Sequence, residues 1–358
     1  MTIKNATLYL WVYNGAFGSR PADPSYVLYK EVKTGAEVIT FEIAELVKDF
    51  IEVNFTGDYT NIVETSWVEW EMVRVYDDDS NDTITGEYIA INGYGYFEDG
   101  VNPILKKGAL LDNTTIYNPA GENIQLPILT GDDGAYKADY YNGNTLLRTD
   151  TFGPSLVAIT ADTTDYTADT TNLTADMTIA SGSTSSIIIR VIPPANTTRI
   201  VVTRNDAVTE TIYVKETEEC KYSPYKVSFL NRYGIVQDLW FFKRRDDNIN
   251  ISKDDYMQNT LSESVSGVSY SLNKAAKMPT NFTASKGLRM NTGFVSEDHN
   301  EVIQQLLLTE RAWIHEDSNV FPIMPKTSSF QYKTNLNDKV MNFTVDFEYA
   351  YNEINNIK

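Results

Sequence analysis

Three side chains in this sequence belong to types that commonly act as a general base, a metal ligand or a nucleophile: His299, His315 and Cys220. The two histidines fall on different expected elements, and no HExxH, GxSxG, CxxC or GxxxxGKS/T pattern accompanies them. We interpret His299 as a surface residue in the first turn of a helix. Cys220 follows two glutamates, whose charges oppose the formation of a thiolate nucleophile. The sequence therefore predicts no catalytic residue, no cofactor-binding residue, no metal ligand and no enzymatic activity.

Two charged runs are also weak candidates for chemistry. Asp77–Asp82 offers oxygen ligands for calcium, but the run lacks the glycine at the sixth position and the glutamate at the twelfth that an EF-hand loop requires. Lys243–Arg245 could contact phosphate, but Asp246 and Asp247 follow directly and neutralise it. We interpret the first run as an exposed turn and the second as a charge cluster at the end of a hairpin. The 49 carboxylates make a glycosidase-like pair inevitable by chance, so a glycan hydrolase has no further support.

Aromatic residues are the unusual part of the composition, with 23 Tyr, 15 Phe and five Trp. Such residues favour strands and protein contact surfaces. Two clusters, Trp67 with Trp70 and Tyr94 with Tyr96 and Phe97, could stack on sugar rings. Core or interface packing is the more common role of aromatic residues on strands.

Charge is distributed unevenly along the chain. The net charge is -19, of which residues 1–224 carry -18 and residues 225–358 carry -1. Because phosphate affinity comes from clustered Lys and Arg, this balance argues against a nucleic-acid-binding groove. An acidic surface can keep subunits soluble before assembly, or can repel DNA that passes by.

Hydrophobic periodicity predicts a mainly β chain with several domains. Residues 1–104 are expected to form a β-sandwich in which one short helix, over Ile43–Ile51 with Thr40 as its N-cap, packs on a sheet. Residues 105–154 are interpreted as an extended connection rich in Gly, Asn and Pro. Residues 155–222, which begin with three Thr-Ala-Asp repeats spaced by seven, are expected to form a small immunoglobulin-like β domain.

Residues 223–358 are expected to form a C-terminal β-barrel or tube-type domain with one helix. Asp298 and Glu301 resemble a helix-capping pair. The residues that follow place an apolar face on the helix, and strands are expected before and after it. That face consists of Val302, Ile303, Leu306 and Leu307.

The same sequence gives expectations for the compartment. A single cysteine excludes an intramolecular disulfide, and the first residues do not resemble a secretory signal. No apolar run approaches the roughly 18 residues of a membrane span. We therefore expect synthesis in a cytoplasm and no membrane span.

Three segments together resemble virion structural proteins of tailed bacteriophages, in the class of tail-tip, baseplate and neck-ring components. They cover less than a third of the chain. The segments are Gly93–Gly100, Phe229–Gly234 with Asp238–Phe241, and Leu288–Tyr351.

This resemblance implies a homo-oligomeric ring or tube of subunits around a DNA channel, in contact with other virion proteins. DNA would pass nearby without sequence-specific binding, and the protein would be made in the host cytoplasm and reside in the virion. The alternative is a carbohydrate- or receptor-binding β-sandwich module on a virion or cell surface, which the exposed aromatic residues would serve.

Overall fold

The computed structural model describes residues 3–15, 18–32, 39–60, 62–100, 108–130, 136–152, 188–205, 207–327 and 341–353. The chain divides into two compact units. The first comprises Met1–Thr217 with Leu230–Gln237, and the second comprises Glu218–Phe229 with Asp238–Lys358. Strands dominate both units, so the predicted mainly β class with several separate sheets is confirmed.

The first unit begins with an antiparallel sheet whose described strands follow the order β2-β1-β3-β4. These strands are β1 (Ile3–Tyr13), β2 (Tyr26–Glu31), β3 (Thr65–Tyr76) and β4 (Asn81–Ile91). The predicted helix is present but short: α1 spans Ala44–Lys48, with Ile43 rather than Thr40 at its N-cap. Val47 and Ile51 pack on Leu10 and Val12 of β1, so the helix covers one face of the sheet.

Both alternating residue sets of β3 are partly covered, as its two apolar phases predict. Trp70 lies on the face that carries the helix, where its ring crosses Gly86 of the paired strand. A Cβ atom at Gly86 would stand 2.5 Å from the nearest atom of the Trp70 ring. Glycine at that position is therefore required by the packing of the indole.

A two-layer β-sandwich forms the rest of the first unit. Its smaller sheet has the order β10-β7-β5, and its larger sheet has the order β6-β12-β11-β8-β9. The strands of the smaller sheet are β5 (Gly108–Ala109), β7 (Leu126–Leu129) and β10 (Ile188–Val191). Those of the larger sheet are β6 (Thr115–Pro119), β8 (Tyr136–Asn142), β9 (Thr145–Phe152), β11 (Arg199–Arg204) and β12 (Ala207–Thr217).

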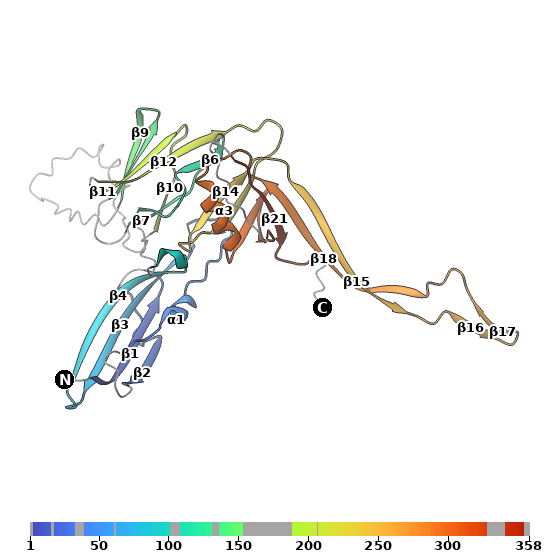
Figure 1. Cartoon of the computed structure of the whole chain (residues 1–358), viewed down its shortest axis with the longest axis horizontal. Coiled ribbons are helices and arrows are strands. Elements are labelled where there is room, and N and C mark those ends of the chain that lie inside the picture. The colour runs from blue at the N-terminus through green and yellow to red at the C-terminus, as the bar shows by residue number, and fades with distance from the viewer. Residues whose placement is uncertain are drawn as a thin grey trace, which may run out of the picture. The chain divides into compact units, whose positions relative to one another are not determined.

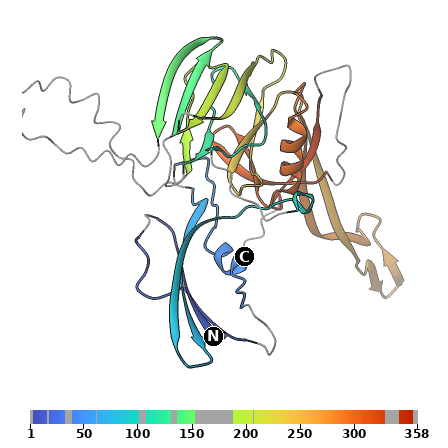
Figure 2. The ribbon, with the colours of Figure 1, turned by 60° about the vertical axis from the view of Figure 1, so that its left-hand side comes forward.

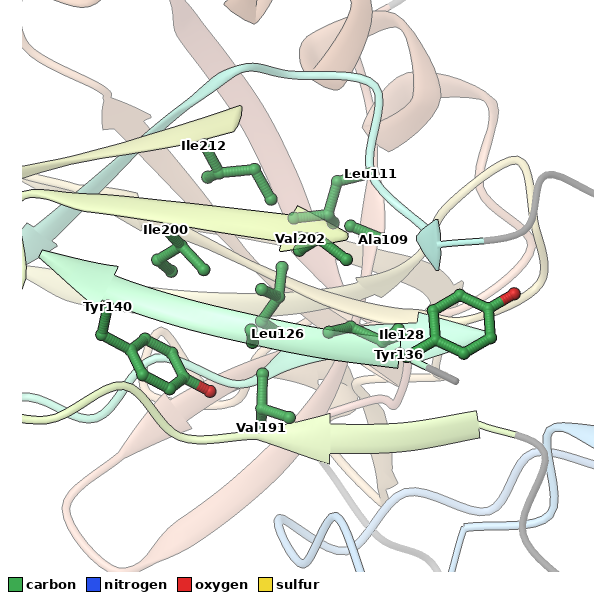
Figure 3. Packing of buried hydrophobic residues seen from close by; sticks show 11 residues of the cluster. Ala109, Leu111, Leu126, Ile128, Tyr136, Tyr140, Val191, Ile200, Val202 and Ile212 are labelled. Atoms are coloured by element: carbon green, nitrogen blue, oxygen red, sulfur yellow. The ribbon is translucent and has the colours of Figure 1, made fainter. Parts of the chain in front are cut away.

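Side chains from both sheets of this sandwich enclose one apolar core (Figure 3). Leu126 and Ile128 of the smaller sheet and Tyr140, Ile200 and Val202 of the larger sheet are almost completely buried. Burial of such side chains contributes about 1.5–3 kcal/mol each. The sandwich is therefore a separate hydrophobic core within the first unit.

The sandwich differs from the predicted arrangement in its chain segments. Residues 105–154, interpreted as an extended connection, supply β5 to β9, which lie in the same two sheets as β10 to β12. In addition, β12 pairs with β6 in parallel, whereas the sheets of an immunoglobulin-like sandwich are antiparallel. The Thr-Ala-Asp repeats lie outside the described residues. Short apolar runs such as Leu126–Leu129 are fully buried here although the sequence around them is rich in Gly, Asn and Asp.

The second unit is built on a mixed-length antiparallel sheet of order β14-β13-β19-β20-β21-β18-β15. Its strands are β13 (Tyr225–Leu230), β14 (Val236–Phe241), β15 (Asp246–Met257), β18 (Lys277–Asn291), β19 (Ala312–Glu316), β20 (Asn319–Pro325) and β21 (Thr344–Tyr349). Among the described strands, β14 and β15 remain at the two edges, so the sheet is open and the expected barrel closure is not found.

The predicted C-terminal helix is present as α3 (His299–Leu308), which lies beside this sheet (Figure 2). Asp298 is its N-cap residue, as the sequence indicated, although its carboxylate accepts a bond from the Ser296 hydroxyl rather than capping the helix backbone. Val302, Ile303 and Leu306 form the buried face. The expectation for His299 was wrong, because this side chain is 2% exposed.

The segment Leu230–Gln237, which contains the turn between β13 and β14, belongs to the first unit. It packs closely against the residues that follow β4. Gly234 has a φ of 70°, and a Cβ atom there would lie 2.6 Å from the carbonyl carbon of Asn92. Next to it, the backbone N–H of Tyr94 donates to the carbonyl of Arg232 at 2.8 Å. The two backbones approach so closely that only glycine fits.

We predict that Gly234→Ala lowers the free energy of unfolding more than Gly100→Ala. Both glycines have a left-handed φ, 70° and 65°, but a Cβ atom at Gly100 would meet nothing within 4 Å. The control should lose about 1–2 kcal/mol from backbone strain alone. Gly234→Ala should lose roughly 1–3 kcal/mol more because of overpacking. Urea unfolding of both variants measures the difference, and equal losses would show that the close approach is unimportant.

Candidate functional site

One cluster in the second unit brings together the residue types of a catalytic triad. The hydroxyl of Ser228 on β13 donates to Oδ1 of Asp238 on β14 at 2.6 Å. The Oγ atom of Ser228 also lies 2.7 Å from Nε2 of His315 on β19. Pairing of β13 with its sheet neighbours places these three side chains together, which sequence spacing alone did not indicate.

The order of hydrogen bonds in this cluster differs from that of a nucleophilic triad. A catalytic serine donates its proton to histidine, and the carboxylate orients the histidine ring. Here the single proton of Ser228 goes to Asp238, so Nε2 of His315 must act as the donor to the Ser228 oxygen. Ser228 is also 0% exposed, which leaves no room for a substrate carbonyl. The cluster is a satisfied, buried polar network.

His315 is held neutral in this network. Burial lowers the pKa of His315 to about 4, and the nearby charge of Lys226 adds to the effect, while Asp238 opposes it. A neutral imidazole with Nε2 protonated matches the donor role that the geometry requires. The histidine therefore contributes a hydrogen-bond donor to the buried network.

We predict that His315→Gln makes the stability of the second unit less sensitive to acid. The folded pKa of His315 is below the ordinary value of about 6.5. Between those values the unfolded chain binds more protons, so stability decreases as the pH is lowered, by at most about 1.4 kcal/mol per pH unit. Glutamine keeps an N–H donor for Ser228 but does not titrate. Urea unfolding at about pH 7 and about pH 4.5 tests this, and parallel losses in both proteins would contradict it.

The charged runs identified in the sequence are occupied by local pairing. In the turn between β3 and β4, Asp78 accepts bonds from Ser80, and Asp82 pairs with Arg74. No group of three or more His, Cys, Asp or Glu side chains suited to a metal ion occurs among the described residues. The basic triplet pairs with carboxylates as well, through contacts of Lys243 with Glu219, Arg244 with Asp246, and Arg245 with Asp247 and Glu316.

The aromatic clusters considered for sugar binding do not form one platform. Trp67 and Trp70 pack in different clusters: Trp70 joins the core under the helix, and Trp67 packs against Tyr233 and Ile235. Tyr94 and Tyr96 meet edge to face at 5.8 Å, whereas a sugar-binding surface presents ring faces to solvent. These contacts indicate that the two tryptophans and the two tyrosines chiefly stabilise the first unit, whereas Phe97 is fully exposed.

A polar hollow of about 550 Å³ lies on the second unit between β15, β18 and β21. Arg289 forms a bidentate pair with Asp346, at 2.6 and 2.9 Å, and Lys326 pairs with Glu348 at 2.9 Å. Asp246 and Asp247, also in the lining, pair with Arg244 and Arg245. Because these charged side chains are held in ion pairs, they do not converge on a shared point as the groups of a ligand site do.

The contacts described so far leave out a projecting ribbon of the second unit. It is here named the arm and defined as residues 253–286. It comprises the outer halves of β15 and β18 and the residues between them, and it extends beyond the remainder of its sheet (Figure 1). All of β15 is exposed. Just before the arm, Ile249 and Ile251 share one face of β15 and are 53% and 63% exposed, and Phe282 on β18 is also exposed. The ribbon thus carries apolar side chains that no layer covers among the residues that the structure describes.

The end of the arm is a small amphipathic hairpin formed by β16 (Leu261–Ser264) and β17 (Gly267–Tyr270). Leu261 pairs with Tyr270, and Glu263 pairs with Val268, so these four side chains share one face. The other face carries serines. Val265 in the turn is fully exposed, and Leu272 beyond it is 91% exposed. This tip hairpin therefore has an apolar face with no core beneath it.

Sequence reasoning missed the arm. The signal was present in residues 261–270, where serine alternates with Leu, Glu, Val and Tyr. Such alternation predicts a half-buried strand and does not show whether another segment of the chain covers it.

Among the described residues, neither helix has the length and apolar content needed to cross a lipid bilayer. Comparison with protein families, with curated proteins and with solved structures finds no match for this chain.

Proposed function

We propose that the protein is a structural subunit of a bacteriophage tail, baseplate or neck, which assembles with copies of itself and with other virion proteins into a ring or tube around the DNA channel. The observation that carries the self-assembling part is the exposed arm. The virion setting rests on the sequence resemblance of Gly93–Gly100, Phe229–Gly234 and Leu288–Tyr351.

The energetics of the arm support an assembly role. A hairpin of two strands is only marginally stable in water, because it lacks a second layer on which to bury apolar side chains. Here Leu261, Val268, Tyr270 and Leu272 are each more than half exposed along one ribbon. Exposed apolar surface that is concentrated in this way marks contact sites. Contact with other subunits would supply the missing layer.

The buried polar clusters also support the proposal of a structural subunit. Ser228, Asp238 and His315 satisfy one another, and the charges around the polar hollow are paired. The described polar groups are thus used to hold the fold, while the apolar arm offers its surface to a partner.

We predict that the purified protein self-associates with increasing concentration. Burial of about 1,200–2,000 Å² is the usual range for a stable interface, and the arm offers several apolar side chains toward it. Sedimentation velocity over a wide concentration range would show species larger than 40.4 kDa, and electron microscopy should resolve them as closed or stacked particles. A protein that stays monomeric at high concentration, with no such particles, would end the proposal.

A further inference from the structure

We propose that the tip hairpin docks through its apolar face onto the acidic body of another copy, so that each subunit donates its arm to a different surface of the next. This inference rests on the proposed function and specifies the contact through which assembly occurs. It concerns an arm-to-body contact, in contrast to contacts between two arms or between two bodies.

The tip hairpin has the surface that such a contact needs. Leu261, Val268 and Tyr270 are 56%, 63% and 67% exposed and lie on one face of the two strands. Ser262 and Ser269, which pair with each other, lie on the opposite face. One face is therefore suited to an apolar partner surface, and the other to water.

Charge favours the body of another copy, meaning all residues outside the arm, as that partner. The arm carries four lysines against three carboxylates, a net charge of +1, so the body carries -20. The lysines lie outside Leu261–Tyr270, along the rest of the arm, so they attract the body and steer the encounter, while the apolar face of the tip makes the contact. Two bodies repel each other, and two arms gain nothing from charge.

A lipid surface is the less suitable partner for the same face. Glu263 lies on it, directly opposite Val268. A carboxylate among the apolar side chains opposes insertion into hydrocarbon, whereas a protein surface can supply a partner for it.

The arm-to-body contact also fixes the symmetry of the assembly. Contact between two different surfaces is heterologous, and repeated heterologous contact closes into a ring or grows as a filament. A subunit whose tip is inactive keeps its receiving surface. Such a subunit should accept the arm of one neighbour but should not dock its own arm onto another.

The test uses the full chain with Leu261→Ser and Tyr270→Ser together, and the matched control changes Ser262→Ala and Ser269→Ala on the opposite face. Both pairs are exposed, so circular dichroism and thermal unfolding should match the wild type. We expect the tip variant to weaken self-association by about 100-fold or more in Kd, because two large apolar side chains lose their burial. The control should stay within about threefold of the wild type.

Mixing then separates the possible contacts. An excess of the tip variant, added to labelled wild type, should shorten the assemblies, because it accepts arms without donating one. If arms bound arms, the tip variant would be inert in the mixture, and the inference would fail. Raising the salt concentration from about 0.05 to about 0.5 M should weaken wild-type association, since screening removes the attraction between arm and body.

The remaining outcomes are also decisive. Wild-type assembly that the tip variant reproduces unchanged would overturn this inference and leave the proposed structural role standing. A wild type that never associates would overturn the proposed role itself. Flotation of the wild type, but not of the tip variant, with phosphatidylcholine vesicles would show that the tip binds lipid and would overturn the arm-to-body contact.

Discussion

A sheet segment only two strands wide cannot cover its own apolar side chains. This constraint decides which apolar surfaces are buried within the subunit and which remain exposed. Each sheet of a stable domain buries one face on a second layer. The β-sandwich of the first unit does so around Leu126, Ile128 and Ile200, and the second unit has α3 beside its sheet. The arm has no such layer among the described residues, so its apolar surface is available for the contact with another copy that we propose.

The parts that hold the first unit together rely on buried polar contacts as well as on apolar packing. Arg190 and Glu64, both less than a tenth exposed, pair at 2.5 Å. Together they bind the backbone of Val236, because Glu64 accepts its N–H at 2.8 Å and Arg190 donates to its carbonyl at 3.0 Å. Burial raises the pKa of Glu64, and the Arg190 charge opposes that shift. Removal of one partner would leave an uncompensated buried charge, which typically costs about 3–5 kcal/mol. The turn Leu230–Gln237 is thereby fixed in the first unit.

Sequence reasoning succeeded where local periodicity and burial agree. The helical spacing of Val302, Ile303 and Leu306 predicted α3 and its buried face, and strand alternation predicted the mainly β class. It failed where pairing between distant segments decides the structure. Leu126–Leu129 is too short to be recognised as a core strand until Ile188–Val191 pairs with it. His299 was placed on the surface because the helical period alone did not show how deeply the first turn is buried.

Because local patterns do not show which distant strands pair, the sequence did not indicate that Ser228, Asp238 and His315 lie together. Their arrangement nevertheless bears on function. Residues 87 positions apart meet only because β13 lies next to β19. Once they meet, the direction of each hydrogen bond decides between chemistry and stability, since Ser228 has one proton and gives it to Asp238. Residue types that suggest an enzyme thus form a closed network. The described structure instead leaves apolar side chains uncovered along an arm of net charge +1, and the remaining residues carry -20. Association with another copy there would lower the free energy of both.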